Sequence, residues 1–241
     1  MKILKEKDDP TQGCTYLHID IDSLPQNIKI CLINIKTSQL IAEKISTIIF
    51  DESWMKILDP MVQKAYNSIV RKTINKLNDI CQKVIDNPQI EKDFGEIMVS
   101  ITASESLKHL FDHLSLPISE LWKEKLSGNP GFDFHTVCPK DFIHFGEAKY
   151  SSSKNPYTEA IDQADGFIKE EKHLYDIINL EKIFEKKEPI ENLAQDKFSI
   201  VAAFSINSDN PKLIIENAVK KVSEFNINTS AQNIYLVGVI C

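Results

Sequence analysis

Arginine is almost absent from this sequence. Of its 28 basic residues only Arg71 is an arginine, and 35 acidic residues leave a net charge of −7. Proteins that bind DNA unaided usually carry a basic face, because phosphate neutralisation dominates their affinity, and arginine is the usual bidentate reader of guanine. The composition therefore argues against an independent, sequence-specific DNA-binding protein. If the chain acts on DNA, we expect a partner to deliver the substrate.

Glycines, paired cysteines and long apolar runs are scarce too. Seven glycines in 241 residues form no glycine-rich phosphate-binding loop. The five cysteines, at positions 14, 31, 81, 138 and 241, have no CxxC spacing, which predicts reduced, mostly buried thiols and no structural zinc. No apolar run approaches the ~20 residues of a membrane helix, and the N-terminal residues lack the apolar core of a signal peptide. We therefore expect a cytoplasmic protein with no membrane partner.

The hydrophobic pattern indicates an α/β protein. Strands are predicted at residues 15–21, 28–35, 198–206 and 233–241, and helices at residues 60–85, 91–114, 157–178 and 211–225. Residues 39–50 are compatible with a helix or a strand, and residues 182–191 are predicted to be a solvated loop. We divide the chain into an N-terminal α+β extension, residues 1–90, and a core, residues 91–241.

The most informative stretch is residues 131–150. It predicts two short strands, residues 132–138 and 142–150, joined by a turn at residues 139–141. Successive side chains on a strand point to opposite faces, so Glu147 and Lys149 share one face. Asp133, near the start of the first strand, can lie close to them across the hairpin.

Two carboxylates and a lysine are the residue types that phosphodiester cleavage needs. Hard oxygen ligands such as Asp133 and Glu147 suit Mg²⁺, which polarises a phosphate and promotes ionisation of the attacking water. A cation such as Lys149 can orient that water or stabilise the negative charge of the transition state. The alternative is an unrelated α/β scaffold, in which Glu147 and Lys149 form an ordinary, exposed ion pair with no metal affinity.

An Asp followed about a dozen residues later by Glu-x-Lys resembles the PD-(D/E)XK nuclease superfamily. The resemblance implies a restriction-endonuclease-like core: a mixed central sheet flanked by helices, in the order helix, three strands, helix, strand. Residues 118–126 would then hold the first of these strands. By the same resemblance, Glu96 on the preceding helix completes the metal site, the backbone carbonyl of Ala148 is a further ligand, and Mn²⁺ could replace Mg²⁺.

Other residues could assist at this site. His135 lies on the same face as Asp133 and could either help there or hydrogen-bond to a neighbouring strand. Gln163 and Phe167 are similar to the Gln-x-x-x-Tyr motif of RecB-type nucleases, with Phe in place of Tyr. The polar loop after the second strand supplies candidates for phosphate contact: Ser151, Ser152 and Lys154.

A more specific resemblance combines Gly95-Glu96, the Gly-x-Asp-Phe-His run at 131–135 and Phe-Gly-Glu-Ala-Lys-Tyr at 145–150. Together these elements, which span roughly residues 90–180, resemble the HamA (AbpA-type) subunits of Hachiman anti-phage defence systems. This resemblance implies a metal-dependent, non-sequence-specific DNA nuclease effector held by a superfamily 2 (HamB-like) helicase, with residues 1–90 as a possible docking region. A competing hypothesis is a catalytically silent subunit that binds nucleic acid or regulates a helicase.

Overall fold

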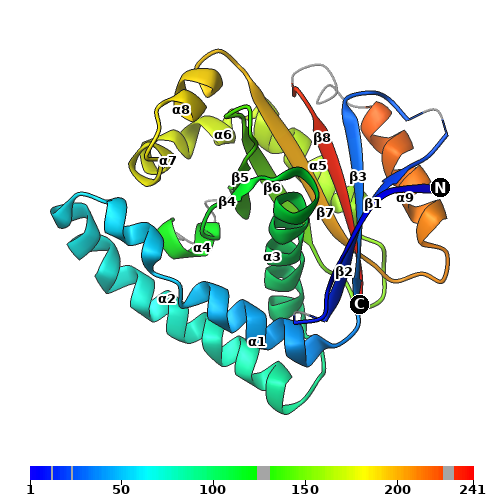
Figure 1. Cartoon of the computed structure of the whole chain (residues 1–241), viewed down its shortest axis with the longest axis horizontal. Helices are drawn as coiled ribbons and strands as arrows, with labels where there is room; N and C mark the ends of the chain where they lie inside the picture. Colours follow the sequence, from blue (N-terminus) through cyan, green and yellow to red (C-terminus); the bar gives the residue numbers. More distant parts are fainter. Residues whose placement is uncertain (12, 23, 124–130, 225–230) are drawn as a thin grey trace.

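The computed structural model describes residues 1–11, 13–22, 24–123, 131–224 and 231–241. Their strands are β1 Lys2–Asp9, β2 Cys14–Asp20, β3 Ile28–Ile35, β4 Leu114–Ser115, β5 Phe134–Val137, β6 Ile143–Lys149, β7 Phe198–Ile206 and β8 Ile234–Ile240. These strands form one eight-stranded mixed sheet in the order β1-β2-β3-β8-β7-β6-β5-β4 (Figure 1). The chain is therefore an α/β protein, as predicted.

The helices are α1 Ser38–Ile49, the 3₁₀ helix η1 Ser53–Ile57, α2 Pro60–Asp86, α3 Lys92–Phe111, α4 Ser119–Trp122, α5 Tyr157–Lys169, α6 Lys172–Tyr175, α7 Ile177–Ile183, α8 Glu188–Leu193 and α9 Pro211–Ser223. Helix α3 crosses one face of the sheet, and α1 and α2 pack outside it (Figure 1). Helices α5 and α9 cover the other face. No helix in the described ranges is long and apolar enough to cross a membrane.

The centre of the sheet is its most buried part. The neighbours β3, β8, β7 and β6 are parallel to one another, while the pairs at both ends of the sheet are antiparallel. Every residue of β7 is buried, because parallel strands with helices on both faces have no solvated side. This explains why apolar runs predicted β3 and β7 with the bounds observed.

Helix α3 is buried on nearly all sides, because the sheet covers one side of it and α1 and α2 cover the other. Two of its small polar side chains donate their hydroxyl hydrogens within the helix, whereas Ser104 Oγ is buried without a partner among the described residues. Thr102 Oγ1 donates to the Met98 carbonyl (2.7 Å), and Ser106 Oγ donates to the Ala103 carbonyl (2.7 Å). Small residues therefore allow this helix to approach the sheet closely without leaving the hydroxyls of Thr102 and Ser106 unpaired.

The sheet runs across the proposed boundary at residue 90. Strand β3 of the N-terminal region pairs with β8, the last strand, from Ile28–Ile234 to Asn34–Ile240. The division of functions between residues 1–90 and 91–241 stays a prediction, but both regions share one sheet. All five cysteines are free, and three of them are buried, as expected for reduced thiols.

The strand predicted at residues 118–126 is wrong. Residues Ser119–Trp122 form the short helix α4, and residues 124–126 lie outside the described ranges. Trp122 Nε1–H donates to the Pro117 carbonyl (2.9 Å), which closes this helical turn. The strand on the other side of β5 from β6 is instead the two-residue β4, which follows α3 after a short turn.

The single helix predicted over residues 157–178 is also wrong beyond Lys169. Glu171 has a positive φ of 54°, and the chain continues as the separate helices α6 and α7. Tyr175 and Ile178, which lie near the end of the predicted helix, are 67% and 68% exposed. The predicted loop at 182–191 contains the end of α7 and most of α8, and the exposed edge strand β1 was not predicted.

Candidate functional site

The site begins where β5 and β6 separate. The Asp133 N–H donates to the Gly146 carbonyl (2.8 Å), and the next N–H on that edge of β6, from Ala148, donates to Asp133 Oδ2 (2.9 Å). The Asp133 carboxylate thus replaces a backbone acceptor at the point where strand pairing ends. Gly146 is required here, because a Cβ atom on it would lie 2.3 Å from the Phe134 ring.

Glu147 and Lys149 lie on one face of β6, as predicted. Lys149 Nζ and Glu147 Oε1 are 2.5 Å apart. The Glu147 side chain is only 1% exposed and that of Lys149 is 20% exposed. The unrelated-scaffold alternative predicted an exposed ion pair, whereas this pair is mostly buried.

The electrostatics of Glu147 set it apart from a satisfied carboxylate. Its Oε2 is buried and has no hydrogen-bond partner among the described residues. Burial, together with the negative charge of Asp133, raises the pKa of Glu147 well above its usual value, although Lys149 opposes this shift. Burial works against the charged form of Lys149, but the charges of Glu147, Asp133 and Glu96 outweigh it and raise the pKa of Lys149. Lys149 therefore stays charged, but its positive charge does not fully offset the effects of burial and of Asp133 on Glu147.

Glu96 reaches this centre from α3. Its charge contributes to the raised pKa of Glu147, although the side chain is 40% exposed and lies 3.8 Å from Lys92. The preceding Gly95 lets the helix sit directly on Tyr150, since a Cβ atom there would lie 2.2 Å from the tyrosine ring. The structure thus brings Asp133, Glu147 and Lys149 together, with Glu96 at their edge.

The donor set suits a hard divalent cation. Asp133 and Glu147 offer carboxylate oxygens, and the unpartnered Oε2 of Glu147 is a buried acceptor of the kind that a cation would complete. Within the described ranges, no group of three His, Cys, Asp or Glu side chains is already arranged to hold a metal. Any cation here would therefore depend on two carboxylates plus other oxygen ligands. The Ala148 carbonyl stays a prediction for that role.

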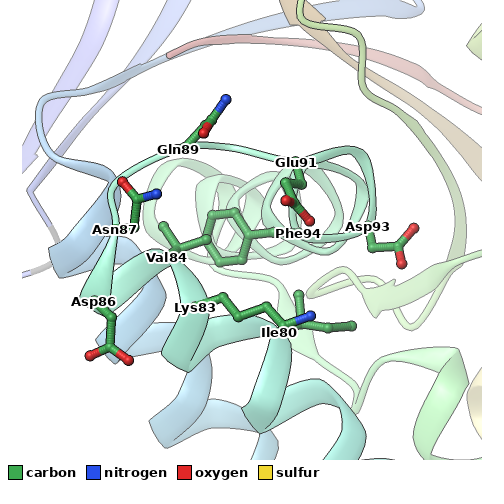
Figure 2. A pocket seen from close by; sticks show the side chains of 9 residues that line it. All are labelled: Ile80, Lys83, Val84, Asp86, Asn87, Gln89, Glu91, Asp93 and Phe94. Carbon is green, nitrogen blue, oxygen red and sulfur yellow. The ribbon is translucent and has the colours of Figure 1, made fainter.

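A groove of about 780 Å³ borders the centre between α2, α3 and α4. Its walls carry Ser68, Lys72, Thr73, Lys76, Leu77 and Ile80 from α2, Asp93, Glu96, Ile97 and Ser100 from α3, Glu120 from α4, and Lys123 and Asp133 beyond it. A smaller hollow of about 360 Å³ adjoins it at the α2–α3 turn and shares Ile80 and Asp93 with it. Figure 2 shows Phe94 beside Val84 in the middle of this hollow.

His135 does not contact the carboxylate centre through its hydrogen bonds. It is fully buried, and its Nε2 lies 2.9 Å from Asp176 Oδ2 while its Nδ1 lies 3.4 Å from Ser119 Oγ. Lys123 Nζ is 2.8 Å from Asp176 and 3.0 Å from the Phe132 carbonyl. The partners of His135 therefore lie on α4 and between α6 and α7, and not on a neighbouring strand. The pattern of strand residues contained no signal for Asp176, which lies 41 residues away.

The loop after β6 is tied to the end of β7. The Ser151 N–H donates to Ser205 Oγ (3.0 Å), and Asn207 Nδ2 donates to the Ser152 carbonyl (2.5 Å). Ser151 Oγ accepts from the Lys154 N–H (3.1 Å), so this hydroxyl is engaged within the loop. Ser152 and Lys154 are exposed, and Gln163 is half-buried on α5. Their roles in phosphate contact and at the site stay predictions.

Comparison with models of known protein families gave no match, and neither did comparison with curated proteins or with solved structures. Functional assignment therefore depends on the residues and their geometry.

Proposed function

We propose that this chain is a metal-dependent, non-sequence-specific deoxyribonuclease that hydrolyses phosphodiester bonds at the Asp133–Glu147–Lys149 centre. The observation that carries the proposal is the unpartnered, buried Oε2 of Glu147, next to a second carboxylate and a lysine. A buried carboxylate oxygen without a donor is costly, and such groups are concentrated at functional sites. The order α3, β4, β5, β6, α5, β7 also supports a PD-(D/E)XK-type core.

In this proposal Asp133 and Glu147 hold Mg²⁺, or Mn²⁺ in its place, and Glu96 and the Ala148 carbonyl are further candidate ligands. The bound cation supplies Lewis-acid chemistry, which polarises the phosphate and promotes ionisation of the attacking water. Lys149 stays protonated and stabilises the charge that develops on the phosphate oxygens. Asp133 also holds the open edge of β6 through its bond from the Ala148 N–H.

The biological setting belongs to the same proposal. By resemblance to Hachiman systems, the chain acts in the cytoplasm as an anti-phage effector with a HamB-like superfamily 2 helicase. The net charge of −7 and the single arginine support this partnership, because a helicase would bring the DNA that the chain binds weakly.

The test is cleavage of a plasmid and of a single-stranded oligonucleotide in Mg²⁺ or Mn²⁺, with and without a HamB-like helicase. Lys149→Ala and Glu147→Ala should each lower the rate by at least ~100-fold, since each removes a group that stabilises the transition state. Lys212→Ala and Glu216→Ala are matched controls, because they remove an exposed ion pair on α9. Cleavage that persists in both site variants of folded protein would contradict the proposal.

A second candidate is the catalytically silent subunit, which binds nucleic acid or regulates a helicase. It is favoured by the direct Lys149–Glu147 pair and by the lack of a ready three-residue ligand group in the described ranges. It predicts nucleic-acid binding or a changed helicase rate with no cleavage in any metal. The cleavage assay above separates the two candidates.

A further inference from the structure

Helix α2 presents a regular row of polar residues to the groove beside the centre. Ser68, Lys72 and Lys76 recur every fourth residue, and all three are exposed and line the groove. A helix rises 1.5 Å per residue, so successive members of the row are about 6 Å apart along the axis. That spacing is comparable with the separation of neighbouring phosphates on one nucleic-acid strand.

The two lysines are available to bind a ligand. Neither Lys72 nor Lys76 forms an ion pair with any residue that the structure describes, whereas Lys92 on α3 is paired with Glu96. Lys123, which also lines the groove, is paired with Asp176. The free positive charge of the groove therefore lies on α2.

Charge is segregated across the groove. Four acidic residues line the groove outside α2: Asp93 and Glu96 on α3, Glu120 on α4, and Asp133; the lysines Lys72 and Lys76 line it from α2. Between the walls, Leu77 and Ile97 supply apolar surface. A phosphate backbone bound along α2 would thus lie near the carboxylates without contacting them. Only the reacting phosphate would approach the centre.

We propose that this groove binds one strand of nucleic acid, with Lys72 and Lys76 as its phosphate contacts, and directs that strand to the Asp133–Glu147–Lys149 centre. This inference rests on the proposed nuclease function and deepens it by naming a single strand as the substrate form. The volume of about 780 Å³ accommodates a few nucleotides of one strand, whereas a duplex would have to lie across the rim. A helicase partner produces single strands.

The inference assigns part of the N-terminal region to substrate binding. Residues 60–86 form α2, which lies outside the helix–strand core of the proposed nuclease. Non-specific single-strand binding typically combines a cationic groove that follows the backbone with side chains on which bases stack. Among the described residues, the lining of this groove supplies the lysines and the apolar side chains Leu77 and Ile97, but no aromatic ring. The N-terminal region then contributes a wall of the active-site groove in addition to any docking role.

The test measures binding of a labelled oligonucleotide, as a single strand and as the matching duplex, by fluorescence anisotropy at low salt. Ca²⁺ replaces Mg²⁺ so that binding is measured without cleavage. It neutralises the carboxylates but has different geometric demands. Wild type should bind the single strand more tightly than the duplex. The double variant Lys72→Gln/Lys76→Gln should lose about tenfold in single-strand affinity, and its salt slope should fall by about 1.4, which is 0.7 for each lost contact.

The matched control is Lys64→Gln/Arg71→Gln. Both residues are exposed on the same helix, and neither lines the groove, so the change in net charge is identical. The control should bind as wild type. Equal affinity of the Lys72/Lys76 variant and wild type, an equal loss in the control, or tighter binding of the duplex would each overturn the inference.

Cleavage assays on the same proteins separate this inference from the proposed function. If wild type cuts DNA and the Lys72→Gln/Lys76→Gln variant cuts it equally well, the groove assignment fails and the nuclease stands. If the groove lysines control binding but no metal supports cleavage, the groove assignment holds and the chain is the silent subunit. The Glu147→Gln variant in Mg²⁺ gives a second binding measurement without cleavage.

Discussion

Two carboxylate–lysine networks include residues of the β5–β6 hairpin, His135 of β5 in the first and Glu147 and Lys149 of β6 in the second, and they differ in how completely the carboxylate is paired. In the first network, Asp176 receives hydrogen bonds from Lys123 (2.8 Å) and His135 (2.9 Å). In the second, Glu147 is bonded to Lys149 through Oε1, and its Oε2 has no partner among the described residues. Similar residue types thus give one completed network and one incomplete network.

The pKa shifts of the two carboxylates reflect this difference. Burial acts to raise the pKa of Asp176, but the hydrogen bonds and charges of His135 and Lys123 outweigh it, and that pKa is lowered. Burial also raises the pKa of Glu147, and here Asp133 adds to the shift, so the lysine cannot reverse it. Removing one partner of a complete buried pair is costly, because it leaves an uncompensated charge, whereas an incomplete pair is suited to take another cation.

The largest predicted effect is a contrast between two amide substitutions. Asp176→Asn should lower the free energy of unfolding by about 3 kcal/mol, because it leaves Lys123 without its counter-charge. Glu147→Gln should change it by less than about 1 kcal/mol, because the lost pairing with Lys149 is offset by removal of an under-compensated buried charge. Urea unfolding of both variants at neutral pH measures the contrast. Equal losses would show that the two networks are equivalent.

Magnesium should act on only one of the networks. If Mg²⁺ binds the folded centre and not the unfolded chain, a concentration 100 times the dissociation constant stabilises the protein by about 2.7 kcal/mol. The shift in melting temperature should disappear in Glu147→Gln and persist in the exposed-pair control Glu216→Ala. A full Mg²⁺ shift in Glu147→Gln would place the bound cation elsewhere.

The seating of α3 beside the centre depends on Gly95. Alanine normally stabilises a helix relative to glycine, but a Cβ atom at Gly95 would lie 2.2 Å from the Tyr150 ring. Gly95→Ala should therefore cost about 1–3 kcal/mol through overpacking. Gly166 on α5 is the matched control, since a Cβ there meets no described atom within 4 Å, and Gly166→Ala should gain about 0.5–1 kcal/mol.

The pH dependence of stability separates the centre from other buried groups by its sign. Burial lowers the pKa of His113 from 6.5 to about 4, so the unfolded chain takes up this proton first. Stability from His113 is complete above pH 6.5 and falls by up to about 1.4 kcal/mol per pH unit between pH 6.5 and 4. Glu147, with its raised pKa, contributes in the opposite direction, so stability from its protonation grows as the pH falls.

Urea unfolding at several pH values between 7 and 5 checks these signs. His113→Gln should flatten the acid loss of stability, and Glu147→Gln should steepen it. If the loss of stability at low pH is unchanged in His113→Gln, His113 does not cause it.

The sequence alone determined the elements whose pattern is local. Apolar runs predicted β3 and β7 with the observed bounds, and a 3.6-residue repeat predicted α2 and α3. The spacing of Asp133, Glu147 and Lys149 predicted their meeting, because strand alternation and a tight turn determine which residues share a face. In such patterns, a few neighbouring residues are enough to determine the secondary structure and which side chains share a face.

Only the tertiary structure decided the rest, because those features depend on partners distant in sequence. Strand β1 has no buried side and exists only through pairing with β2. His135 lies 2.9 Å from Asp176, which is 41 residues away in the sequence, and Lys72 of α2 and Asp133 line one groove that no local pattern encodes. The residue types of the site could thus be predicted from the sequence. That Glu147 Oε2 has no hydrogen-bond partner among the described residues follows only from the packing around it.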